Sequence, residues 1–408
     1  MAERMFGIET KYAITGSAGD KSVPRESLVF QILHTARRQV ASLPDMCGNG
    51  IYLENGSRFY IDCGLHPEYA TPECVNPWDA VRYVKAGEQL IARVLSQLEQ
   101  EQGKGWAVLC FICNVDYGEH STWGSHESYL HRTDPAHLPG QLIPHLVSRV
   151  IYTGAGGFNP LCSGIDFTLS PRASHIVKVV SGDSTGNRGI FHTKDESLSS
   201  QGYHRLHVLC GESLCSEAAM WLRVGATALV AAMIEGGLNT GATVELQSPL
   251  DALRVVASDP TSRATLRLSK GGSCSALEVQ RHYLAQAEAH AGEKYMPPWA
   301  EQVCVRWRET LDLLECGPQA VETTLDWAIK RALYSDYAGR RGIFWESVSH
   351  WNFVLDKLNK ALEGVEYPDG TVTPDFVLGP ESPIRGDVEQ LTPYLNKHKM
   401  TWDGLDRF

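Results

Sequence analysis

Apolar and polar residues alternate in two ways along the first 270 residues, and the two periods predict strands and helices in the same part of the chain. Short runs that are apolar or alternate residue by residue predict strands at residues 5–14, 59–61, 106–114, 123–130, 167–170 and 175–180. Apolar residues three and four positions apart predict helices at residues 27–39, 78–100 and 216–235. The strand at residues 106–114 is expected to be buried, because its run is apolar. The mixture indicates an α+β fold.

The pattern changes after residue 270, where helical periodicity dominates. Helices are predicted at residues 276–291, 299–315, 320–337 and 347–363. The last residues are rich in Pro, Gly and Asp, which predicts irregular structure. We therefore expect a mixed catalytic body at residues 1–270, a helical extension of the same domain at residues 271–363 and an irregular tail at residues 364–408.

The composition is that of an ordinary soluble protein and disfavours several classes of function. The formal charge of −11 argues against a general nucleic-acid surface. The longest apolar run, residues 226–234, is shorter than the roughly 20 residues that cross a membrane. No secretory signal is visible, and eleven scattered cysteines do not form a disulfide framework. We expect a cytoplasmic protein that binds neither membranes nor nucleic acid.

The stretch with the densest candidate chemistry is residues 55–73. A predicted strand ends at Asp62, and the following loop, which is interrupted by prolines, carries His66, Glu68 and Glu73. A single acid of this kind more often caps a turn or forms a surface ion pair. Several carboxylates with a histidine at one strand end suit metal binding or acid–base chemistry.

Other polar side chains lie on predicted strands or at their ends. They are Glu9, His126, Glu127, Arg205 and His207. If the strands converge on one face of a sheet, these residues surround one pocket together with Asp62 and Glu68. Carboxylates with histidine suit Mg²⁺ or Mn²⁺, while Arg205 and Lys194 suit phosphate oxygens. Such a set of groups is typical of phosphoryl transfer from ATP.

A series of ordered blocks between residues 5 and 337 resembles one known family. The main blocks are residues 7–10, 55–73, 124–130 and 203–211, with support from residues 85–88, 146–149, 325–327 and 329–331. They resemble the family of the Pup ligase and the Pup deamidase (depupylase), which is related to glutamine synthetase. The resemblance implies an antiparallel sheet that forms a concave cradle, is backed by helices and binds ATP and Mg²⁺. The implied ligase phosphorylates the C-terminal glutamate of the ubiquitin-like protein Pup and joins it to a substrate lysine, whereas the deamidase hydrolyses the amide or isopeptide bond.

Individual positions take their expected roles from this resemblance. Asp62 corresponds to the catalytic aspartate, which would deprotonate the incoming lysine in a ligase, or attack the carbonyl or activate water in a hydrolase. Arg205 corresponds to a phosphate-facing arginine with a catalytic role, and Lys194 and Asn114 complete the expected nucleotide contacts. The expected metal ligands are Glu9, Glu68, His126, Glu127 and His207.

Some positions depart from the family's pattern. Lys11 stands where the family has a second glutamate, two residues after Glu9, so one metal ligand is lost and a positive charge is added. Lys194 replaces an arginine, and Cys113 replaces an asparagine and leaves Asn114 as the remaining one. The family's small C-terminal domain, which helps to form the groove for Pup, has no expected counterpart beyond residue 340.

The sequence leaves the direction of the reaction open. The deamidase carries a long insertion where residues 42–50 stand here, which favours a ligase, whereas residues 76–81 resemble the deamidase. A small-molecule amide ligase fits the missing C-terminal domain, and an ATP-binding pseudoenzyme fits Lys11 and Lys194. We expect an ATP- and Mg²⁺-dependent carboxylate–amine ligase that acts on Pup, on a Pup-like protein and its conjugates, or on a small amino acid or peptide.

Overall fold

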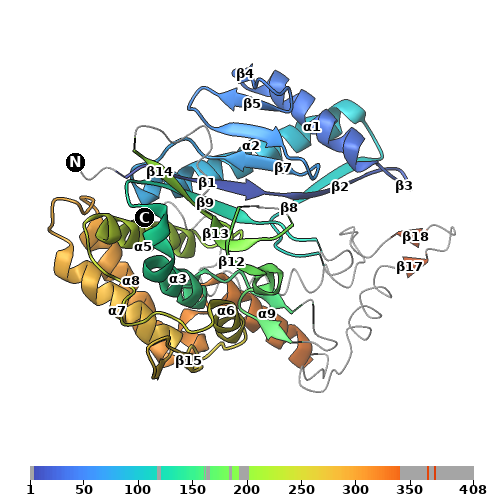
Figure 1. Cartoon of the computed structure of the whole chain (residues 1–408). Coiled ribbons are helices and arrows are strands. Elements are labelled where there is room, and N and C mark those ends of the chain that lie inside the picture. Colours follow the sequence, from blue (N-terminus) through green and yellow to red (C-terminus); the bar gives the residue numbers. More distant parts are fainter. Residues whose placement is uncertain are drawn as a thin grey trace.

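A computed structural model gives the architecture of the chain, with a large sheet at its centre (Figure 1). It describes residues 4–116, 121–159, 161, 166–182, 186–192, 202–340, 365–366 and 372–373. The nine-stranded sheet has the order β12-β13-β14-β9-β1-β7-β6-β5-β4. Its strands are β1 (Phe6–Lys11), β4 (Ser42–Pro44), β5 (Gly50–Leu53), β6 (Arg58–Ile61), β7 (Pro67–Ala70), β9 (Ser125–His131), β12 (Lys178–Ser181), β13 (Gly189–His192) and β14 (His204–Val208).

Most neighbouring strands of this sheet are antiparallel, and β12 and β13 form a parallel pair at one edge. The expected α+β class with an antiparallel sheet is therefore confirmed. Shorter strands form separate small sheets. They are β2 (Ala13–Ala18), β3 (Lys21–Ser22) and β8 (Trp106–Phe111) in one sheet, and the pairs β10 (Gly157–Phe158) with β11 (Phe167–Thr168), β15 (Leu266–Arg267) with β16 (Ser273–Cys274), and β17 (Val365–Glu366) with β18 (Val372–Thr373).

Two strand predictions need correction. The strand expected at residues 5–14 is divided into β1 and β2, which belong to different sheets. The strand expected to be buried at residues 106–114 is β8, which is an edge strand whose Leu109 and Phe111 are 52% and 45% exposed. An apolar run does not reveal whether one or both faces of a strand are covered, and here only Val108 of that strand is buried among the core residues.

The helices follow the predicted periodicity closely. They are α1 (Arg25–Gln39), α2 (Pro77–Gln102), α3 (Leu138–Ser148), α4 (Val150–Thr153), α5 (Glu217–Glu235), α6 (Pro249–Ala257), α7 (Ala276–His290), α8 (Ala300–Cys316) and α9 (Asp326–Arg340), with short 3-10 turns at Pro135–His137, Pro171–His175 and Pro318–Val321. Helices α3, α4 and α6 are not among the helices predicted above, and α9 begins six residues later than expected. The helix expected at residues 347–363 lies outside the described residues.

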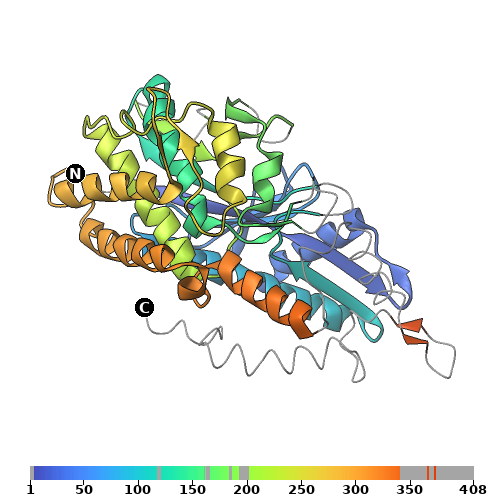
Figure 2. The same ribbon diagram turned by 90° about the horizontal axis from the view of Figure 1, so that it is seen from below.

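Helices cover one face of the large sheet and bury its apolar side chains. Phe6 and Ile8 of β1 belong to a core that extends through α3, α5, α7 and α8 to Trp327 of α9. Figure 2 shows α7 and α8, in gold and orange, side by side along this flank. A second core lies between α1, α2 and the strands β5 to β7. Residues after 270 thus share a hydrophobic core with the mixed part of the chain.

Helix α5 is buried along almost its whole length. By length and composition it is the one described helix that could cross a membrane, but 89% of its apolar window is buried inside the protein. Its side chains fill the main core under β9. The apolar run that raised the question of a membrane segment is therefore explained by burial in the core.

Helix α2 fixes the strand that carries Glu68. Gly87 of α2 lies against the ring of Tyr69 in β7, and a Cβ at Gly87 would come within 2.4 Å of that ring. The Tyr69 hydroxyl donates a hydrogen bond to Ser57 Oγ at 2.7 Å. The close packing of α2 against Tyr69 and this hydrogen bond hold β7 in place. Glu68 points to the opposite face of the strand and is therefore presented there at a defined position.

Candidate active site

The register of the central strands gathers polar side chains on the face of the sheet that the helices leave uncovered. Glu9 of β1 is paired with His126 of β9, and Lys11 of β1 is paired with Glu68 of β7. Glu68 is in turn paired with Tyr60 of β6. Because cross-strand partners point to the same face, these five side chains line one surface.

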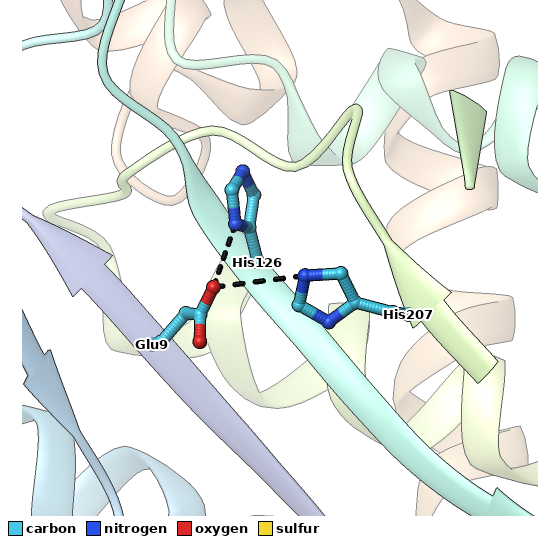
Figure 3. A group of neighbouring side chains, drawn as sticks. All are labelled: Glu9, His126 and His207. Atoms are coloured by element: carbon cyan, nitrogen blue, oxygen red, sulfur yellow. Dashed lines mark hydrogen bonds and ion pairs between the residues drawn. The ribbon is translucent and has the colours of Figure 1, made fainter. Parts of the chain in front are cut away.

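Glu9, His126 and His207 form a compact group, here called the histidine cluster, and their side chains point toward one another (Figure 3). Glu9 Oε1 lies 2.8 Å from His126 Nδ1 and 3.6 Å from His207 Nε2. One donor atom of each residue lies within 4.8 Å of the others, so the group could hold a metal ion. Burial lowers the pKa of both histidines and favours the neutral imidazole, which is the form that binds metals.

Arg205 and Ser128 hold the ring of His207 from its other side. Arg205 Nη2 donates to His207 Nδ1 at 3.0 Å, and Ser128 Oγ also lies 3.0 Å from that nitrogen. Arg205 Nε donates to Ser128 Oγ at 3.0 Å. The predicted phosphate-facing arginine therefore orients a residue of the histidine cluster and places its positive charge beside it.

Asp62 lies directly after β6 and shares Lys11 with Glu68 as an ion-pair partner. Its Oδ1 accepts hydrogen bonds from the backbone amides of Gly64 at 2.8 Å and His66 at 2.9 Å, while its Oδ2 is in contact with Lys11 Nζ. Burial alone would raise the pKa of Asp62, but the hydrogen bond with His66 and the Lys11 ammonium outweigh it and lower the pKa. The carboxylate is thus ionised and held in one orientation.

Glu68 belongs to strand β7, whereas the sequence predicted it in a loop. Lys11 Nζ lies 2.5 Å from Glu68 Oε1, and the Tyr60 hydroxyl also bonds this carboxyl group. Burial and the nearby charge of Glu9 raise the pKa of Glu68 to about 7, against the opposing effect of Lys11. The row of Lys11, Glu68 and Tyr60 therefore lies beside the histidine cluster as a second polar group.

The raised pKa of Glu68 predicts a pH dependence of stability. The native state holds a proton that the unfolded state, with a carboxyl pKa of 4.5, releases earlier. This contribution to stability is complete below the unfolded pKa and is lost as the pH rises through about 7. Glu68→Gln has no such proton to lose, so its melting temperature should rise relative to the wild type between about pH 5 and pH 8.

Thermal unfolding of both proteins across that range measures the difference. The matched control is Glu73→Gln, because Glu73 is an exposed acid five residues further along the chain. A constant difference between wild type and Glu68→Gln would contradict the prediction.

Glu127 lies on the other face of the sheet, although it was expected among the metal ligands. Adjacent residues of a strand point to opposite faces, so His126 and Glu127 cannot both enter one cluster. Glu127 is fully buried and accepts two hydrogen bonds from Arg149, at 2.6 and 2.9 Å, and one from the Tyr129 hydroxyl at 2.6 Å. These contacts remove Glu127 from the candidate metal ligands and give it a structural role.

Two expected nucleotide contacts also need comment. The amide of Asn114 is buried, donates to the backbone oxygen of Ser213 at 3.1 Å and accepts from the Ser213 amide at 2.7 Å. Both ends of this side chain are therefore used within the protein, which argues against contact with a nucleotide. Lys194 lies outside the described residues.

Tyr60 and Ser128 were not singled out in the sequence. Tyr60 lies two residues before Asp62, and the period of two in a strand places both on one face. Ser128 lies two residues after His126 for the same reason. The spacing of two residues from Asp62 and from His126 could have indicated them. Hydroxyl side chains are common on strands, however, so this spacing identifies a site residue only once the register is known.

Known proteins resemble the chain over most of its length. Residues 4–356 match the family described as "Pup-ligase protein". "Pup--protein ligase 1" of Rhodococcus erythropolis is 36% identical over 350 residues, which cover 84% of this chain and 76% of that protein. "Pup--protein ligase" of Nocardia farcinica is 36% identical over 348 residues, which cover 83% of this chain and 75% of the relative.

Solved structures agree with the sequence match. The crystal structure of the complex between prokaryotic ubiquitin-like protein Pup and its ligase PafA gives a TM-score of 0.72 at 29% identity and covers 85% of this chain and 70% of that one. The structure of the Pup ligase PafA in complex with ADP gives a TM-score of 0.65 at 28% identity and covers 80% and 72%. Together, the extent of the sequence match and the agreement in fold show that this chain belongs to the Pup ligase family.

Proposed function

We propose that the chain is an ATP-dependent ligase that joins the C-terminal glutamate of Pup, or of a Pup-like protein, to a lysine of a target protein. The observation that carries the proposal is the ionised Asp62 carboxylate, which two backbone amides hold and which contacts Lys11 on the same sheet face as the histidine cluster. Support comes from relatives that are named Pup--protein ligase. One similar structure is a complex with Pup and another is a complex with ADP.

The residues present fit the expected binding of a nucleotide with a divalent ion. Glu9, His126 and His207 would hold the ion, since their donor atoms already converge. Arg205 stands beside them with a guanidinium that suits phosphate oxygens. Such an ion, expected from the sequence to be Mg²⁺, neutralises charge on the phosphates during phosphoryl transfer.

The proposed chemistry has two steps. An oxygen of the side-chain carboxylate of the C-terminal glutamate attacks the γ-phosphorus of ATP. The bond to ADP breaks, and an acyl phosphate forms. The lysine nitrogen then attacks the acyl carbon, phosphate leaves, and an isopeptide bond results. The amine must lose its proton for this attack, and Asp62 is the group placed to accept it.

One oxygen of Asp62 is better suited to this task than the other. Oδ1 is already occupied by the amides of Gly64 and His66, whereas Oδ2 contacts only the Lys11 ammonium among the contacts described. Oδ2 is therefore the oxygen that would take the proton, after the Lys11 ammonium has moved away from it. The contact with Lys11 makes Asp62 a weaker base in the resting protein, because a nearby cation stabilises the carboxylate.

The test is a reaction of the purified chain with ATP, a Pup that ends in glutamate, and a lysine-containing target protein. Mass spectrometry of the products should find a target–Pup isopeptide and an equal amount of ADP. Cleavage of a preformed conjugate without net conjugation would favour the hydrolase of the same family instead. If neither reaction occurs, the proposed substrate is wrong.

A further inference from the structure

The polar face holds two groups of potential cation ligands with different chemistry. The histidine cluster offers two imidazole nitrogens and one carboxylate. The second group, here called the oxygen cluster, consists of Tyr60, Asp62 and Glu68 and offers only oxygen atoms. All-oxygen sets suit hard ions such as Mg²⁺, whereas imidazoles shift the preference toward ions such as Mn²⁺ and Zn²⁺.

Lys11 occupies the oxygen cluster. Its Nζ contacts Asp62 Oδ2 and lies 2.5 Å from Glu68 Oε1. A divalent ion that bridged these two oxygens would take the place of that nitrogen, so ammonium and ion exclude each other. The exclusion is built into the sheet, because Lys11 and Glu68 are direct cross-strand partners in β1 and β7.

The cation beside the histidine cluster is Arg205, which contacts His207 at Nδ1 and not at the Nε2 atom that faces Glu9. A first-row divalent ion binds imidazole and carboxylate at about 2.1 Å, which places neighbouring donors about 3 to 3.5 Å apart. The distances of 2.8 and 3.6 Å from Glu9 Oε1 to the two histidines are close to this requirement. Binding of an ion at His207 Nε2 requires the ring proton on Nδ1. Arg205 Nη2, which donates to Nδ1 at 3.0 Å in the ion-free protein, must then turn from this nitrogen, and Ser128 Oγ at 3.0 Å accepts the proton instead.

We propose that Lys11 is a built-in cation that excludes a divalent ion from the oxygen cluster. This chain then holds a single divalent ion, at the histidine cluster, and prefers Mn²⁺ to Mg²⁺ there. The proposal rests on the proposed function only for the part that the ion plays in catalysis. Binding of the ion needs neither ATP nor Pup, so the two proposals can fail separately.

The experiment counts Mn²⁺ ions on the full, nucleotide-free chain by electron paramagnetic resonance. Mn²⁺ is preferable to Zn²⁺, because the exposed thiols of Cys47, Cys63 and Cys316 would also bind Zn²⁺. The wild type should bind one Mn²⁺ that about a tenfold excess of Mg²⁺ does not displace. Glu9→Gln should lower the Mn²⁺ affinity by a factor on the order of 10 to 100.

Lys11→Glu separates the two clusters. The substitution removes the ammonium and places a third carboxylate beside those of Asp62 and Glu68. The variant should therefore bind a second Mn²⁺ ion at the oxygen cluster, and added Mg²⁺ should displace this second ion. The matched control is Lys21→Glu, which makes the same charge change at an exposed lysine of β3 and should leave one ion bound.

Several results would overturn the proposal. They are two ions or none in the wild type, one ion in a folded Lys11→Glu variant, and Mn²⁺ binding that Glu9→Gln leaves unchanged. The wild-type count decides the matter even if Lys11→Glu does not fold. A chain that binds one Mn²⁺ but forms no conjugate would contradict the proposed function alone, and a chain that conjugates with two bound ions would contradict this inference alone.

Discussion

Asp62→Asn should lower the rate of isopeptide formation by a factor on the order of 10² to 10⁴, the range expected for loss of a general base. An amide has nearly the shape of the carboxylate but cannot take a proton from the incoming amine. The backbone amides of Gly64 and His66 can still donate to the side-chain oxygen of Asn, so the local structure should persist. ADP affinity should change little, because Asp62 is not part of the histidine cluster.

Both quantities are best measured on one preparation, conjugation by mass spectrometry and ADP binding by calorimetry. Asp20→Asn is a suitable control, because Asp20 lies in an exposed turn and should tolerate the same chemical change. Full turnover of the Asp62→Asn variant would show that Asp62 is structural. A loss of ADP binding equal to the loss of turnover would assign Asp62 to nucleotide binding instead.

Glu127→Ala should lower the free energy of unfolding by about 3–5 kcal/mol, the range for breaking a buried ion pair. The substitution leaves the guanidinium of Arg149 without its two carboxylate hydrogen bonds in the interior. It also removes the charge that lies 3.6 Å from the buried Arg223. Uncompensated buried charges are costly, and the Tyr129 hydroxyl loses its acceptor as well.

Denaturant unfolding measures this change in stability. Asp251→Ala is the control, because Asp251 and Arg254 form an exposed ion pair worth less than about 1 kcal/mol. The folded Glu127→Ala protein should still bind Mn²⁺ as the wild type does, since Glu127 lies on the other face of the sheet. Unchanged stability combined with a lost ion would restore Glu127 to the metal ligands.

The helices could be predicted from the sequence because their signals are local. The apolar spacing predicted a helix at residues 78–100, and α2 runs from Pro77 to Gln102. The Asn76 side chain accepts from the Asp79 amide at 2.9 Å, as an N-cap should. Strands were harder, because the break at Tyr12 and the exposed position of β8 depend on partners that lie far away in the sequence.

The candidate site could be predicted as a set of residues but not as a geometry. The resemblance to the family identified Glu9, Asp62 and Glu68 as candidates, and the structure brings them to one face of the sheet. Residue spacing places His126 and Glu127 on opposite faces of a strand, but it does not show which of them faces the site, because that depends on the register of β9 in the sheet. Likewise, the contact of Lys11 with both Asp62 and Glu68 follows from the register of β1 against β7, which no local pattern encodes.

Transfer of oxygen from Pup to phosphate tests the central claim most directly. Pup is prepared with ¹⁸O in the side-chain carboxylate of its C-terminal glutamate. The wild-type chain then conjugates it with unlabelled ATP. If an acyl phosphate forms and the lysine nitrogen displaces phosphate, one ¹⁸O atom appears in the released phosphate for each isopeptide bond. Conjugates that form while all of the phosphate remains unlabelled would contradict this mechanism.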